Sequence, residues 1–297
     1  GQERAKGTLG SPYAVADYTD VNPAFGTKED FRALVEAAHA RGMTIILDWV
    51  ANHTAWDNPW VRQHPDWYTR DSTGQITHPP GTDWTDVADL NYDSRAMREA
   101  MTEALRYWIT EFDIDGYRCD QAFLVGQGLL WKKCIAELKR QKDILMLAES
   151  EDPWMVEEGF DIVYPWKMFH TKVDIAAGKK PASAIDSVNN LVNSSFPARA
   201  LQLYFTSNHD ENSWNKADYG TMPGPAHAPF AVLSQTFVHG VPLIYSGQEE
   251  PFLDSLSFFY KDTIRFSRYG RAGFYKTLLN LRSDHAALAA NAGFRKI

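Results

Sequence analysis

The chain has 297 residues, of which 44% are hydrophobic and 13% aromatic, so it can bury a large core and is not disordered. Its net charge of −8, without a long run of like charge, argues against nucleic acid and anionic membranes as partners. No apolar stretch approaches the roughly 18 residues that a membrane span needs. Cys119 and Cys134 are too few for a disulfide framework and lack metal-site spacing. The first residues do not resemble a signal peptide, and the sequence leaves the compartment open.

Helical and strand patterns alternate along the chain after a loop-like start. Thr27 is a predicted N-cap for a helix over residues 28–41, which Gly42 ends. Residues 44–50 form a continuous apolar run, typical of a strand buried on both faces of a parallel sheet. The segment 54–94 that follows is too long for a simple connection and is predicted to be a small inserted subdomain.

More strands and helices are predicted after the insertion. The expected strands are 112–120, 144–148, 160–164, 200–206 and 241–247. The expected helices are 95–111, 128–142, 227–239 and 270–283, with helical stretches up to 194. About six strand–helix units in succession predict a parallel sheet, either a barrel or a doubly wound sheet. No Gly-x-Gly-x-x-Gly or Walker-type turn follows any strand, which disfavours nucleotide binding.

Acidic side chains gather where the predicted strands end. Arg118 and Asp120 are two residues apart on one strand, so their side chains share a face. We expect the arginine to keep Asp120 ionised and oriented, as a carboxylate nucleophile requires. The other strand ends carry Asp48, Glu149, His209 and Asp210. So many carboxylates are hard to explain as helix caps, and they predict an active site at the carboxyl face of a (β/α) barrel.

This set of side chains suits glycoside chemistry. A retaining glycosidase needs one ionised carboxylate as nucleophile and one protonated carboxyl as acid, about 5 Å apart. A third carboxylate can bind sugar hydroxyls and stabilise the positive charge that builds at the anomeric centre. Carboxylates accompanied by an arginine and by the histidines His53 and His209 therefore predict a glycosidase.

Short motifs of the chain resemble those of the α-amylase superfamily of retaining glycoside hydrolases, which act on α-linked glucans. They are Asp48-Trp-Val-Ala-Asn-His53, Val87-Ala-Asp-Leu-Asn91, Gly116-Tyr-Arg-Cys-Asp120, Leu147-Ala-Glu149 and Phe205-Thr-Ser-Asn-His-Asp210. Their order and spacing make the match specific, and it covers residues 7–285. The resemblance implies an α/β fold, a TIM-type (β/α) barrel over residues 1–53 and 95–297. A small B domain, residues 54–94, is inserted after the third family strand.

The resemblance assigns a role to each residue that matches its motifs. Asp120 corresponds to the nucleophile, Glu149 to the acid and base, and Asp210 to the carboxylate that binds the 2- and 3-hydroxyls of the sugar. Glu151 is a rival for the acid, although the family motif places the acid first after the strand. The residues expected to bind the sugar or to support the nucleophile are Tyr13, Asp48, His53, Arg118 and His209.

Asn52 and Asp89 match family calcium ligands that tie the inserted domain to the barrel. Leu124 stands where the family has a further histidine ligand, and Phe123 where a lysine usually precedes it, so calcium binding stays open. No organic cofactor is expected. Four tryptophans of the insertion are favoured as its small core over a role in sugar stacking: Trp56, Trp60, Trp67 and Trp84.

The chain departs from the family in its architecture. The family barrel has eight strands, and the first two, together with the C-terminal β-sandwich, are apparently missing here. Missing strands would leave an open sheet edge and exposed apolar surface. Three explanations stay open: a fragment, a smaller closed barrel, or self-association that covers the edge with another copy of the chain.

The favoured function is endo-hydrolysis of α-1,4-glucosidic bonds in starch or maltooligosaccharides by a retaining double displacement. An α-glucosidase, cyclomaltodextrinase or transglycosylase of the same superfamily is the nearest alternative. A catalytically inactive α-glucan-binding remnant is a different class, although the intact Asp120, Glu149 and Asp210 argue against it. A sugar-phosphate barrel enzyme is disfavoured because the last two strands lack a Gly-rich phosphate site.

Overall fold

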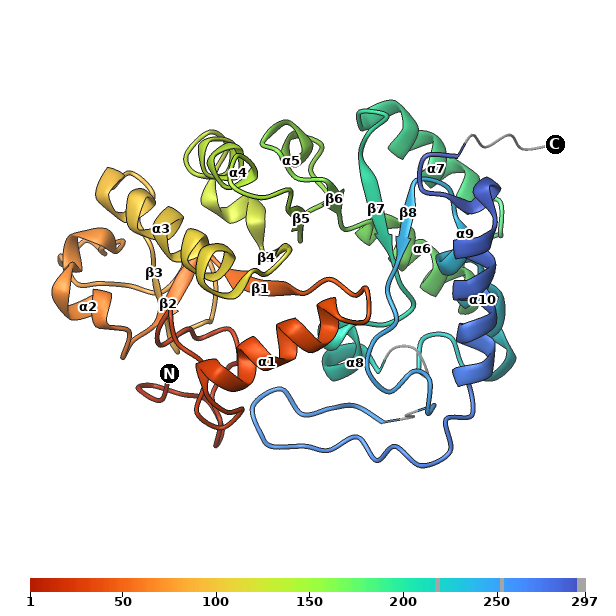
Figure 1. The fold of residues 1–297 in the computed structure, drawn as a ribbon, viewed down its shortest axis with the longest axis horizontal. Helices are drawn as coiled ribbons and strands as arrows, with labels where there is room; N and C mark the ends of the chain where they lie inside the picture. Colours follow the sequence, from red (N-terminus) through yellow and green to blue (C-terminus); the bar gives the residue numbers. More distant parts are fainter. Residues whose placement is uncertain (217–219, 252–253, 293–297) are drawn as a thin grey trace. The chain divides into compact units, whose positions relative to one another are not determined.

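A computed structural model describes residues 1–216, 220–251 and 254–292 (Figure 1). The chain divides into two compact units, Gly1–Asp161 and Ile162–Ile297. The strands are β1 (Ile46–Val50), β2 (His53–Ala55), β3 (Val87–Asp89), β4 (Gly116–Asp120), β5 (Leu145–Ala148), β6 (Ile162–Val163), β7 (Leu201–Tyr204) and β8 (Gly240–Pro242). The α-helices are α1 (Lys28–His39), α2 (Pro59–Gln63), α3 (Arg95–Phe112), α4 (Trp131–Lys139), α5 (Trp154–Glu157), α6 (Trp166–Ala176), α7 (Ala184–Ser195), α8 (His209–Asn215), α9 (His227–Thr236) and α10 (Ala272–Asp284). Every helix in these ranges is too short or too polar to cross a membrane.

The first unit is built on a parallel sheet in which β4 lies between β1 and β5. The whole of β4 is buried, as expected of a strand covered on both faces. Gly116 begins β4 with φ +149°, and a side chain there would clash with the main-chain carbonyl of Leu145 in β5. Glycine at this position therefore lets the two strands approach closely.

Helix α1 begins where the sequence predicts. Thr27 caps it: its hydroxyl accepts the N–H of Asp30, and the Asp30 carboxylate accepts the N–H of Thr27. This reciprocal pair satisfies two main-chain donors that the first helical turn leaves without partners. The helix ends at His39, slightly before the predicted end at residue 41.

Helix α3 covers β1 and β4 with its buried stripe. The indole N–H of Trp49 in β1 lies 3.3 Å from the sulfur of Met101. The hydroxyl of Tyr117 in β4 donates to the carbonyl of Leu105. The rings of Trp49 and Tyr117 thus fill the core while their N–H and O–H groups donate to atoms of α3. Buried donors without such partners would reduce stability.

The strand predicted over 112–120 is wrong at its start. Phe112 is the last residue of α3, and Asp113 ends the helix in the left-handed conformation, with φ +57°. The Phe112 ring packs against Phe31 of α1 and Trp108 of α3, with centroids 5.6 and 4.9 Å away. Packing on the helical stripe therefore decides the conformation of Phe112, and β4 begins only at Gly116.

Residues 54–94 contain helix α2 and most of the antiparallel pair β2–β3. Trp60 meets Trp67 edge-on, with ring centroids 5.2 Å apart. Trp84 packs against the buried Ala55. These contacts support the interpretation of the tryptophans as a small core. The division of the chain into a barrel and an inserted domain stays a prediction.

The second unit is built on a parallel sheet in which β7 lies between β6 and β8. Helix α9 packs on β8 and lies beside α10 (Figure 1). The strand predicted over 241–247 is shorter than expected, because β8 ends at Pro242. Beyond it Tyr245 and Gln248 close a turn: the main-chain N–H of Gln248 donates to the Tyr245 carbonyl, and its side-chain oxygen accepts the Tyr245 N–H.

A buried lysine ties the elements of the second unit together. Lys172 of α6 is 1% exposed. Its amine donates to the carbonyl of Phe205, directly after β7, and to the hydroxyl of Ser234 in α9, at 2.6 and 2.7 Å. Both partners are neutral, so burial lowers the pKa of Lys172 to about 7.

We expect this lysine to make stability depend on pH. The lowered pKa means that unfolding takes up a proton between about pH 7 and the ordinary lysine pKa of about 10.4, so the free energy of unfolding should rise with pH through that window. Thermal unfolding of the parent and of Lys172→Met would show it as a difference in Tm that shifts in favour of the parent as pH rises. Lys167→Met, at an exposed lysine of the same helix, is the control. A difference that is constant with pH would contradict the assignment.

Candidate active site

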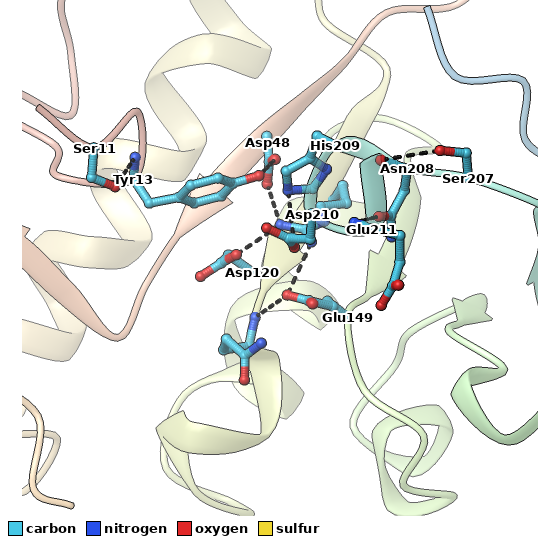
Figure 2. A network of polar contacts seen from close by, with 12 residues as sticks. Ser11, Tyr13, Asp48, Asp120, Glu149, Ser207, Asn208, His209, Asp210 and Glu211 are labelled. Atoms are coloured by element: carbon cyan, nitrogen blue, oxygen red, sulfur yellow. Dashed lines mark hydrogen bonds and ion pairs between the residues drawn. The ribbon is translucent and has the colours of Figure 1, made fainter. Parts of the chain in front are cut away.

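One guanidinium holds three carboxylates in the first unit. Arg118 lies in the buried strand β4. Its Nη1 is 2.9 Å from Oδ1 of Asp48 and 2.9 Å from Oδ1 of Asp120, and its Nη2 is 2.9 Å from Oε2 of Glu149. Figure 2 shows the three carboxylates of this cluster and the dashed contacts that they make. Arg118, Asp48, Asp120 and Glu149 are called the Arg118 cluster below.

The strand register produces this cluster. Asp48 of β1 is directly opposite Arg118 in the parallel ladder. Asp120 is two residues further along β4, so it shares the face of Arg118 as predicted. Glu149 follows β5, and its main-chain N–H donates to the carbonyl of Cys119. Asp48 lies within β1, two residues before its end, as the predicted strand 44–50 places it.

Two groups hold the Glu149 carboxylate through one of its oxygens. It is buried, it pairs with Arg118, and its Oε2 accepts the main-chain N–H of Gln121 at 3.0 Å. Gln121 adopts a left-handed conformation, with φ +41°, which turns the chain after β4. This donor was missed by sequence reasoning, because a main-chain N–H carries no signal in the side-chain pattern.

The charges of the Arg118 cluster do not balance. Asp120 is buried among three charged neighbours, and burial together with Glu149 and Asp48 raises its pKa well above the usual range, although Arg118 opposes the shift. Arg118 lies 2.9 Å from Asp120, and the expectation that it keeps Asp120 ionised and oriented stays a prediction. Neighbouring carboxylates oppose each other's ionisation, and the charge of Arg118 offsets part of this effect.

Tyr13 closes one side of the cluster. Its hydroxyl donates to Oδ2 of Asp48 at 2.7 Å, and its ring centroid lies 5.8 Å from Cζ of Arg118 (Figure 2). Burial and the Asp48 charge raise the pKa of Tyr13, so the phenol stays protonated and acts as a donor. The aromatic face beside a charged cluster can support an apolar face of a sugar.

His53 is a buried, neutral imidazole. Burial lowers its pKa to about 4, although Asp86 opposes the shift. Its Nδ1 lies 3.2 Å from the side-chain nitrogen of Asn52, and its ring meets Trp84 edge-on at 5.6 Å. At neutral pH it can therefore exchange hydrogen bonds with sugar hydroxyls but adds no positive charge.

The two predicted calcium ligands share one hollow. Asn52, just before β2, and Asp89 of β3 are buried and line a hollow of about 350 Å³. Residues Leu124 and Gly126 line the same hollow from the segment after β4. Burial raises the pKa of Asp89, although a hydrogen bond with Thr69 and the charge of His78 oppose the shift. Within the described ranges, no group of three or more His, Cys, Asp or Glu side chains could hold a metal ion.

The second unit carries the remaining predicted site residues. His209 and Asp210 begin α8, and the Asn208 side chain caps this helix by accepting the N–H of Glu211 at 2.8 Å (Figure 2). Nε2 of His209 lies 3.2 Å from Oδ2 of Asp210. The charge of Asp210 also helps to raise the pKa of Tyr245 in the same unit, after burial. The meeting of these residues with the Arg118 cluster stays a prediction.

Each unit therefore brings together part of the predicted set. Tyr13, Asp48, Arg118, Asp120 and Glu149 form one polar network in the first unit. Carboxylates placed by parallel strands are typical of the active sites of barrel-type α/β enzymes. Two carboxyls beside one cation suit glycoside chemistry, which uses one carboxyl as nucleophile and the other as acid.

Comparison with protein families agrees with this class. The model of the family "Alpha amylase, catalytic domain" matches residues 8–85 and 67–263. The chain belongs to the α-amylase family of glycoside hydrolases.

Solved and curated relatives extend the comparison. The structure of the maltogenic α-amylase AmyB from Thermotoga neapolitana is similar, with a TM-score of 0.84 and 30% identity over 97% of this chain and 67% of that one. α-Amylase MalA of Haloarcula japonica is 27% identical over 96% of this chain and 43% of its own length. A cyclomaltodextrinase of Geobacillus thermopakistaniensis is 27% identical over 80% of this chain and 43% of its own length. The chain thus has the TIM-type α/β fold of these proteins and spans less than half the length of these two curated relatives.

Proposed function

We propose that the chain carries the catalytic machinery for endo-hydrolysis of α-1,4-glucosidic bonds in starch or maltooligosaccharides, with retention of configuration. The observation that supports this most is the Arg118 cluster, in which Asp120 and Glu149 are held by one guanidinium. In a member of the α-amylase family these two carboxyls fit the nucleophile and the acid. The relatives' names, which include α-amylase and cyclomaltodextrinase, agree with action on α-glucans.

In the first proposed step, a carboxylate oxygen of Asp120 attacks the anomeric carbon while Glu149 gives its proton to the departing glycosidic oxygen. The bond to the leaving sugar breaks as the bond to Asp120 forms. In the second step, Glu149 removes a proton from water, and the water oxygen displaces Asp120. Two inversions give net retention, and Glu149 ends protonated as it began.

The neighbouring residues have supporting roles in this proposal. Arg118 orients Asp120 and Glu149 and lowers the charge that they present to each other. Tyr13 places its ring beside the cluster, while His53 and His209 bond sugar hydroxyls. Asp210 binds the 2- and 3-hydroxyls and favours the flattened ring of the oxocarbenium-like transition state.

Exo-acting α-glucosidases, cyclomaltodextrinases and transglycosylases of the same superfamily would use the same carboxylates. These enzymes differ from an endo-hydrolase in whether the binding site accepts only a chain end of the glucan, and in whether water or another sugar accepts the glycosyl group. Chromatography of the products from a long maltooligosaccharide separates these alternatives: internal cleavage gives a spread of lengths, whereas exo-action gives one short product. The inactive glucan-binding remnant predicts binding without any product.

We expect the chain to release reducing sugar from soluble starch and Asp120→Asn to lose about a thousandfold or more of this activity, as loss of a nucleophile does. The proton NMR signal of the first product should belong to the α-anomer. Asparagine has nearly the same shape, so a thermal melt that shows a folded variant will separate loss of the nucleophile from loss of the fold.

Two outcomes would contradict this proposal. A folded parent that binds maltooligosaccharides but releases no sugar would be the glucan-binding remnant. An Asp120→Asn variant that keeps the parent's activity would place the nucleophile elsewhere. Glu111→Gln, at an exposed carboxylate at the end of α3, is the control for non-specific effects of losing a charge.

We propose that the hollow beside β2 and β3 binds calcium. The side-chain oxygens of Asn52 and Asp89 are of the kind that Ca²⁺ prefers. Because Leu124 has no side-chain donor, any ligand from that position would be a main-chain carbonyl. Calcium needs six to eight oxygens, so carbonyls and water would supply the rest. The ion would join the β2–β3 pair to the segment after β4 and take no part in the bond cleavage.

Added calcium should raise Tm, by an amount equivalent to about 2.7 kcal/mol when its concentration is a hundred times Kd. Chelation with EDTA should reverse the shift, and Asn52→Ala with Asp89→Ala should abolish it. Asp66→Ala, at an exposed aspartate in the same insertion, should keep the shift. A Tm that does not respond to calcium in the parent would contradict the site.

We propose that β1 corresponds to the third strand of the family barrel and β8 to the eighth. In the described part of the chain, β1 pairs with β4 and stands at the end of the strand order. Along β1 lies a hollow of about 240 Å³, partly apolar, lined by side chains that include Leu47, Phe31 and Trp108. A second copy of the chain could cover this edge.

We expect this edge to produce self-association that depends on concentration. Leu47→Lys places a charge in the hollow and should shift the sedimentation profile toward monomer. Leu191→Lys, at an exposed leucine in α7, should leave it unchanged. A parent that elutes and sediments as a clean monomer at all concentrations would contradict the proposal.

A further inference from the structure

Helix α8 presents an exposed tryptophan that the proposed chemistry does not use. Trp214 leaves 58% of its surface exposed. Its ring centroid lies 5.3 Å from that of Phe258 and 6.2 Å from that of Phe259, and these two rings are 5.0 Å apart. We call Trp214, Phe258 and Phe259 the aromatic platform. An exposed aromatic cluster of this kind usually marks a binding surface.

The platform is held in place by a buried amide. The side-chain nitrogen of Asn212 donates to the carbonyl of Asp254 at 3.0 Å, and its oxygen accepts the N–H of Leu256 at 2.9 Å. These two bonds fix the segment that leads to Phe258 against the helix that carries Trp214. The rings are therefore positioned before any ligand arrives, which lowers the entropy cost of binding.

The helix also relates the platform to Asp210. Residues four apart on an α-helix share a face and differ by about 6 Å along its axis. Asp210 and Trp214 are both within α8, so they are related in this way. That spacing is comparable with the length of one glucosyl unit. A sugar bound by Asp210 would therefore have its neighbour in the glucan chain near Trp214.

We propose that Trp214, backed by Phe258 and Phe259, stacks on a glucosyl ring next to the ring that Asp210 binds, and so favours longer glucans. The inference rests on the proposed function, since it takes Asp210 as a sugar ligand. The apolar C–H face of a glucosyl ring can lie on an indole, while its hydroxyls stay in water. Burial of that face would supply affinity without a charged partner.

The test measures binding of maltoheptaose by isothermal titration calorimetry in an Asp120→Asn background, which does not consume the ligand, with and without each further substitution. We expect Trp214→Ala to weaken binding about tenfold, which corresponds to about 1.4 kcal/mol. Trp214→Tyr keeps an aromatic face and should restore most of the affinity. Phe25→Ala removes an exposed ring of the first unit and should change nothing. The gain in kcat/KM from maltotriose to maltoheptaose should shrink in Trp214→Ala.

Unchanged maltoheptaose affinity in Trp214→Ala would overturn the inference, as would an equal loss in Phe25→Ala. A change in oligomeric state without a change in affinity would show that the platform contacts protein, and would also overturn it. Failure of the proposed function gives a different result: the parent releases no sugar from starch. In that case a tenfold loss of affinity in Trp214→Ala would still support the platform.

Discussion

The shared guanidinium of Arg118 is the interaction on which the first unit depends. Its three carboxylate partners come from β1, from β4 and from the residue after β5, so the cluster forms only when the three strands are in register. A buried arginine without these partners would be an uncompensated charge, whose cost is about 3–5 kcal/mol. The ion pairs of Arg118 therefore stabilise the strand register and the site geometry together. A shift of β4 by one residue would break the ion pairs and displace the carboxylates.

Lys172 is the buried cation of the second unit, and unlike Arg118 it has neutral hydrogen-bond partners. It is a buried cation whose partners are the Phe205 carbonyl and the Ser234 hydroxyl, and its pKa falls to about 7 in consequence. The bonded carbonyl directly precedes the segment that leads to Asp210. The lysine thus holds the end of β7 at some cost in stability at lower pH. Rigid support for this segment is what the role proposed for Asp210 requires.

The parts of the structure that the sequence predicts well are those set by local patterns. The Thr27 cap, the strand β1 and the shared face of Arg118 and Asp120 each follow from short-range rules. The predicted burial of β1 on both faces is wrong for its first part, because Ile46 and Leu47 are half-buried and Asp48 is exposed. The errors come from tertiary contacts: Phe112 joins a helix because its ring meets Phe31. The raised pKa of Asp120 depends likewise on Glu149, which is distant in sequence, and the hydrogen bond from the Gln121 N–H leaves no signal in the side-chain pattern.

The charge of the Arg118 cluster would serve the proposed reaction. In the protein without substrate one cation faces three carboxyls, and burial together with Glu149 and Asp48 raises the pKa of Asp120. In the proposed cleavage, positive charge develops on the sugar, so the carboxylates then face a second cation that is absent from the ground state. An interaction that strengthens only as the charge develops lowers the barrier without tightening substrate binding. In this proposal, the strand register positions three carboxyls around one guanidinium, and the positive charge of the transition state compensates the excess negative charge.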